Sequence, residues 1–182
     1  MFAVSAFGDG DLTIARLDPA TGAVSATAAL PGDLDADGLG PRALAVGGDS
    51  VWVVGATAVA RVDPASLEVT GRFEVDAGPG GIRLATFAGG ALFALVENGA
   101  ALLRIDGEGT VTDRLVLSEE PVEWRLPASL AAGRGHVWVM VQAGSDPARH
   151  DVRIVRVDPA TGAATGVFTV ASELFAGAIA VS

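Results

Sequence analysis

Alternating aspartates make the segment Asp33-Leu34-Asp35-Ala36-Asp37-Gly38 the part of this sequence best suited to chemistry. Carboxylate oxygens are the ligands that Ca²⁺ and Mg²⁺ prefer, and a glycine lets the chain turn so that alternate side chains converge. The sequence therefore predicts a candidate Ca²⁺ or Mg²⁺ site at Asp33, Asp35 and Asp37. A solvated acidic loop is the alternative, because the position at which an EF-hand would supply its last ligand is Leu44.

Two other irregular segments hold candidate ligand-binding residues. Trp124 stands between Glu123 and Arg125 in one segment, and His150 precedes Asp151 in the other. An exposed tryptophan offers a large apolar contact and one hydrogen-bond donor, so we expect Trp124, Glu123, Arg125 and His150 to contact a ligand. The alternatives are a tryptophan packed over a sheet edge and an ordinary surface histidine. Nothing resembles a nucleophile elbow, and no catalytic residue is predicted.

A repeated sequence motif predicts the strands and turns that would position these residues. The phrase Arg16-Leu17-Asp18-Pro19-Ala20-Thr21-Gly22 returns at residues 61–66 and 156–162, with a worn copy at 104–109. The successive aspartates, Asp18, Asp63, Asp106 and Asp158, are 45, 43 and 52 residues apart. Periods in this range are typical of radial or stacked repeat folds.

Each repeat predicts four short strands. In the second repeat these are residues 43–46, 51–54, 59–62 and 68–75, with turns of the Gly/Asp and Asp-Pro types after the first and third. About 45 residues for four strands favours a propeller over a sandwich. The predicted fold is therefore an all-β propeller with four four-stranded blades per chain.

The repeats also predict how the blades are divided. We expect one domain over residues 1–182, with blades at about 1–30 plus 175–182, 42–75, 81–117 and 127–170. The chain begins with the second strand of a blade and ends with a first strand, so these two strands are expected to share one blade. Closure within the chain, an eight-bladed ring from two chains exchanging strands, and a part of a larger propeller all remain open.

Composition excludes several classes of partner. The chain contains arginine but no lysine, and its net charge is −10. This negative charge argues against nucleic acid and anionic membranes as partners. No run of about 18 apolar residues exists, so no membrane insertion is expected. The chain has no cysteine for disulfides, and Met1–Ser5 lacks the basic start of a signal peptide. We expect a cytoplasmic protein or a domain of a longer one, with the compartment itself undetermined.

Three segments, Asp18–Gly22, Pro41–Gly48 and Val51–Val53, resemble the bacterial β-propeller repeats of the YVTN and streptogramin-lyase type. The resemblance covers nearly the whole chain and implies a propeller fold. The streptogramin lyases use a histidine base and a magnesium ion. His136 stands in the turn position that Ser50 holds in another repeat, so it does not match that catalytic histidine.

These observations favour a non-enzymatic binding or scaffold propeller that presents an acidic loop face to a protein or small ligand. The alternatives are a divalent-metal-dependent lyase or lactonase-like enzyme, and a purely structural half-propeller that assembles into a larger ring as a homodimer. Trp52, Phe93 and Trp138 occupy equivalent second-strand positions and are expected in the core between blades. Each repeat arginine is expected to form a local ion pair with the aspartate two residues later.

Overall fold

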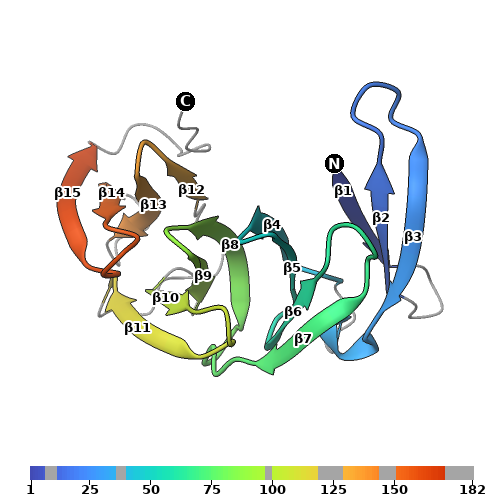
Figure 1. The fold of residues 1–182 in the computed structure, drawn as a ribbon. Coiled ribbons are helices and arrows are strands. Elements are labelled where there is room, and N and C mark those ends of the chain that lie inside the picture. Colours follow the sequence, from blue (N-terminus) through green and yellow to red (C-terminus); the bar gives the residue numbers. More distant parts are fainter. Residues whose placement is uncertain (7–11, 36–39, 97–99, 119–128, 144–150, 171–182) are drawn as a thin grey trace.

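The computed structural model describes residues 1–6, 12–35, 40–96, 100–118, 129–143 and 151–170. These residues form four antiparallel sheets, named sheets I to IV in chain order (Figure 1). Sheet I contains β1 (Phe2–Ala6), β2 (Leu12–Leu17) and β3 (Val24–Leu30). Sheet II contains β4 (Ala43–Gly47), β5 (Ser50–Val54), β6 (Ala58–Val62) and β7 (Val69–Glu74). Sheet III contains β8 (Ile82–Ala88), β9 (Ala91–Val96), β10 (Ala101–Ile105) and β11 (Val111–Val116). Sheet IV contains β12 (Ser129–Gly133), β13 (His136–Ala143), β14 (Asp151–Val157) and β15 (Ala164–Val170).

The strands of each sheet pair in chain order, as the repeat predicts. In sheet II, β4 pairs with β5, β5 with β6 and β6 with β7, and sheets III and IV follow the same order. The predicted all-β propeller is confirmed. Sheet I has three described strands, and the inner strand expected for it lies within residues 175–182, outside the described residues.

The sheets follow one another along an open arc, with sheet I at one end and sheet IV at the other (Figure 1). The first strands face the inside of this arc, because β4 contacts β8 and β8 contacts β12. Since every pairing is antiparallel, the first-to-second and third-to-fourth strand turns gather at one end of the sheets, here the turn end. The remaining connections gather at the opposite end, the loop end. Among the described residues, no helix is long and apolar enough to cross a membrane.

Apolar side chains fill each junction between neighbouring sheets. One cluster joins sheets I and II around Ile14 and Val53, and another joins sheets II and III around Trp52 and Ile82. A third joins sheets III and IV around Phe93. Trp52 is 2% exposed and Phe93 is 0% exposed, which confirms both as core residues between blades. The equivalent Trp138 in sheet IV is only half-buried.

Aspartates at the turn end organise the turn after the third strand. The Asp18 carboxylate accepts backbone N–H bonds from Ala20 at 2.7 Å and Thr21 at 3.1 Å. These bonds favour the ionised carboxylate, so they lower the pKa of Asp18, the bond from Ala20 most of all. The pKa of Asp63 is lowered in the same way, first by the backbone N–H of Ser66 and then by its hydroxyl. Each turn is thus held by its own aspartate.

The repeat arginines join neighbouring sheets instead of pairing with these aspartates. Arg16 of sheet I donates from Nη1 to the carbonyls of Pro64 and Ala65 in sheet II, at 3.3 and 2.8 Å. Arg61 donates from Nη1 to the Gly107 carbonyl of sheet III at 2.6 Å. Arg104 donates from Nε to the Pro159 carbonyl of sheet IV at 3.2 Å. We name this repeated contact the arginine clasp.

The expected local ion pair is therefore wrong, for two physical reasons. The turn backbone already occupies the aspartate, as Asp18 and Asp63 show. In addition, the strand register shifts directly after each arginine, for example between Arg16 and Leu17 and between Arg61 and Val62. The extra residue of each bulge lies on the outer strand and carries a hydroxyl, Ser25 in sheet I and Thr70 in sheet II, which accepts a bond from the arginine Nε at 3.3 Å. The arginine is left directed at the next sheet.

Candidate functional site

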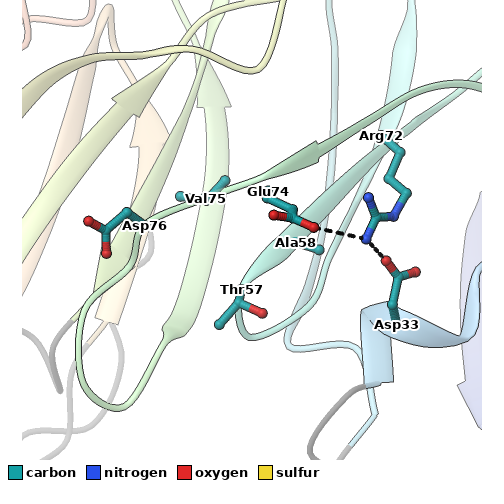
Figure 2. A pocket seen from close by; sticks show the side chains of 7 residues that line it. All are labelled: Asp33, Thr57, Ala58, Arg72, Glu74, Val75 and Asp76. Atoms are coloured by element: carbon teal, nitrogen blue, oxygen red, sulfur yellow. Dashed lines mark ion pairs between the residues drawn. The ribbon is translucent and has the colours of Figure 1, made fainter.

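A hollow of about 590 Å³ opens at the loop end near the junction of sheets I and II (Figure 2). It is built by the short 3-10 helix η1 (Gly32–Asp35), by the connection between β5 and β6, and by β7 with the residues that follow it. The lining residues are Asp33, Thr57, Ala58, Arg72, Glu74, Val75 and Asp76. Residues that are up to 43 positions apart in the chain therefore share one surface.

Packing of η1 brings Asp33 into this hollow. Leu34 is fully buried in the cluster between sheets I and II, so it anchors the helix. The backbone of η1 lies directly against Gly55, where any side chain would overlap the Leu34 carbonyl. With Leu34 turned inward, Asp33 forms an ion pair with Arg72 (Figure 2). A glycine at position 55 is thus a requirement for the shape of the site.

The lining carries more negative than positive charge. Arg72 lies 3.7 Å from the Glu74 carboxylate in addition to its pairing with Asp33. Asp76 contributes a third carboxylate, and its side chain also accepts a bond from the Gly78 N–H at 3.3 Å. Glu74 is 82% exposed, so its carboxylate is open to solvent and to a ligand. The hollow therefore suits a group that carries positive charge and hydrogen-bond donors.

Backbone hydrogen bonds hold the walls of the hollow in place. The N–H of Val75 donates to the Thr57 carbonyl at 2.8 Å, and the N–H of Ile82 donates to the Ala56 carbonyl at 2.7 Å. The connection after β7 is thereby fastened to the connection between β5 and β6. A site on such a frame loses little conformational freedom when it binds a ligand.

The predicted metal ligands are only partly visible in this arrangement. Asp33 lines the hollow and is engaged by Arg72. Asp35 ends η1, its side chain is outside the description, and Asp37 lies outside the described residues. In the part of the chain that the structure describes, no group of three His, Asp or Glu side chains could hold a metal ion. Calcium or magnesium at Asp33, Asp35 and Asp37 therefore stays a prediction.

The predicted ligand contacts Trp124, Glu123, Arg125 and His150 lie outside the described residues. In the chain they fall between β11 and β12 and between β13 and β14. Arg72, Glu74 and Asp76 were not predicted from the sequence. A signal was present, because Arg72 and Glu74 are two apart on an outer strand and so share one side of it.

Comparison with solved structures places the architecture among β-propellers. BamB from Moraxella catarrhalis matches at a TM-score of 0.58 and 12% identity, over 91% of this chain and 47% of that one. The Neurospora crassa Pan2 WD40 domain matches at 0.62 and 12%, over 94% and 52%. The β-propeller domain of Cps50 (Swd1) from Myceliophteria thermophila matches at 0.59 and 14%, over 93% and 55%.

These matches show the fold but do not identify a family. No protein-family model matches the chain, and no curated protein matches it either. The chain spans about half the length of the solved propellers named above. The four described sheets are therefore similar to half of a larger β-propeller.

Proposed function

We propose that this chain is a non-enzymatic binding or scaffold β-propeller whose acidic loop end captures a protein or small ligand bearing positive charge. The observation that carries the proposal is the hollow near the junction of sheets I and II, where Asp33 and Glu74 flank Arg72 and Asp76 adds a third carboxylate to the lining. Irregular connections on a rigid scaffold are where binding usually resides. The net charge of −10 supports a partner of opposite sign.

The other predicted contacts belong to the same proposal. From the irregular sequence segments that hold them, Trp124, Glu123, Arg125 and His150 are proposed to extend the acidic surface with one aromatic contact. From its repeat motifs we also propose that the chain is related to the bacterial propellers of the YVTN and streptogramin-lyase type. A homodimer formed by strand exchange is proposed from the same repeats.

Fluorescence anisotropy with a labelled oligo-arginine peptide tests the acidic site. The double variant Glu74→Gln, Asp76→Asn should bind the peptide about tenfold more weakly, equivalent to ~1.4 kcal/mol. The matched control is Glu68→Gln, Glu108→Gln, which removes the same charge from exposed positions at the turn end. Equal weakening by both pairs would show general charge attraction and contradict the site, as would a peptide that does not bind at low salt.

Calorimetric titration with CaCl₂ and MgCl₂ tests the metal prediction separately. If Asp33, Asp35 and Asp37 form a site, the heat of binding should disappear in Asp35→Ala and persist in Asp49→Ala, an aspartate at the turn end. A parent chain that takes up neither ion would refute this part of the proposal and leave the binding of cationic peptides untouched.

A further inference from the structure

Within the described residues, no sheet follows the last one to supply the carbonyl that the other clasp arginines use. Arg16, Arg61 and Arg104 each donate to a turn carbonyl of the following sheet. Within the described residues, Arg156 donates from Nε to the Thr165 hydroxyl at 3.0 Å and from Nη2 to the Thr165 carbonyl at 3.1 Å. Both of these bonds stay inside sheet IV. The Arg156 guanidinium therefore lies at the end of the arc without a described bond to another sheet.

Aromatic side chains beside Arg156 show the same difference. In sheet II, Phe73 is half-buried and its ring lies against Gly109 of the following sheet. Trp52 stacks on Phe87 of that sheet at 6.0 Å. The equivalent of Phe73 in sheet IV is Phe168, which also lies two residues after the glycine that opposes the clasp arginine. Phe168 is 47% exposed.

At the other end of the arc, none of the described sheets precedes the turn of sheet I. The left-handed residue of this turn is Gly22, with φ +71°, and open space surrounds the position that a side chain would take. The corresponding Gly109 lies against Phe73 of sheet II, and Gly162 lies against Asp113 of sheet III. Gly22 thus exposes the surface that these two glycines bury.

Sizes of side chains at the internal junctions are complementary. Where the outer strand carries alanines, at Ala26 and Ala28 of sheet I, the facing turn carries the larger Leu67 at its left-handed position. Where the outer strand carries Phe73, the facing turn carries Gly109. Phe168 therefore requires a turn with glycine at this position, and the turn of sheet I supplies Gly22.

We propose that the exposed face of sheet IV, formed by Trp138, Arg156 and Phe168, docks onto the Asp18–Gly22 turn of sheet I in a second copy of the chain. Arg156 then donates to the Pro19 or Ala20 carbonyl, as the internal clasps do, and Phe168 covers Gly22. Two such junctions close two open arcs into one ring of eight sheets. A head-to-tail contact that closes at two copies is self-limiting.

The choice of a second copy rests on continuity with the internal junctions and on size. The same clasp, the same aromatic position and the same glycine recur on the two open ends. One chain also spans about half of the solved propellers it matches, so two copies equal the extent of one such propeller. The inference rests on the proposed scaffold function, but its test measures molar mass, so either can fail without the other.

Light scattering on a sizing column, at several protein concentrations, tests the proposal. The parent chain should have twice its formula mass of 18.2 kDa. Phe168→Glu should halve the measured mass, because it places a charge in the apolar centre of the junction. Gly22→Asn should do the same, because asparagine tolerates the left-handed conformation and fits the open space of one chain but not the docked turn.

Controls separate docking from misfolding. Val167→Glu adds the same charge to the neighbouring, 60% exposed position on the other side of β15 and should leave the doubled mass unchanged. An equimolar mixture of Phe168→Glu and Gly22→Asn should recover the doubled mass, since each mixed pair retains one intact junction. A parent chain of single mass would overturn the proposal. Unchanged mass in Phe168→Glu would overturn it too.

Discussion

The turn end and the loop end of the same sheets are built on different rules. At the turn end every junction described uses the same parts: an aspartate turn, a left-handed residue after it and an arginine from the preceding sheet. At the loop end the connections differ in length and sequence, and one of them carries η1 and the acidic hollow. Repetition marks the end that holds the sheets together, and variation marks the end that is free to bind.

Breaking the close contact at the turn end should have the largest effect. In Gly109→Ala the new methyl group overlaps the ring of Phe73, which Trp52 and Arg61 hold in place. Overpacking and the left-handed φ of +79° together should lower the free energy of unfolding by about 3 kcal/mol. Urea denaturation measures this change. Gly90→Ala, with the same φ but open space, should cost about 1 kcal/mol, and equal costs would contradict the packing argument.

Removing an internal clasp should have the next largest effect. Arg61→Ala deletes the 2.6 Å bond to the Gly107 carbonyl and the bond from Nε to Thr70. Charged hydrogen bonds of this kind contribute about 2 kcal/mol, so the urea midpoint should fall accordingly. Arg72→Ala at the loop end is the control, because it removes an equal charge from a half-exposed ion pair. Equal losses in the two variants would erase the distinction between the two ends.

Acid should weaken the turn end through its aspartates. The pKa of Asp63 is lower in the folded chain than its ordinary value of 3.8. The contribution of this carboxylate to the free energy of unfolding is therefore complete above that value and is lost as the pH falls through the folded pKa. Asp63→Asn should therefore be less stable than the parent at pH 7, and the difference should shrink below about pH 3.8. Thermal unfolding across this range measures it. A difference that is independent of pH would contradict the charge-based explanation.

The smallest effect is expected at the loop end. Asp33→Asn removes a carboxylate that pairs with Arg72, but both side chains are more than one-third exposed. Ion pairs of this exposure contribute at most about 1 kcal/mol, so the unfolding free energy should change by less than that. Binding of the oligo-arginine peptide should nevertheless weaken. A stability loss as large as that of Arg61→Ala would show that the hollow holds the sheets together.

Sequence repetition was sufficient to predict the strand order within each sheet. The four-strand unit was visible because turn residues and apolar runs recur, and Trp52 and Phe93 could be assigned to the core from their equivalent positions. The role of the arginines was not visible. Their acceptors are backbone carbonyls more than 40 residues away, and any residue can supply a carbonyl. The hollow was missed apart from Asp33, because Arg72, Glu74 and Asp76 become its neighbours only when sheets I and II pack.

By itself, the sequence determined what depends on local periodicity: short strands, tight turns, the propeller class and the acidic charge. These follow from side-chain alternation and turn chemistry, which act over a few residues. Only the tertiary structure decided which carbonyl each arginine reaches, which carboxylates surround one hollow and which aromatic residue remains exposed at the end of the arc. Those outcomes depend on how one sheet stacks on the next, and stacking is set by packing between residues far apart in the chain.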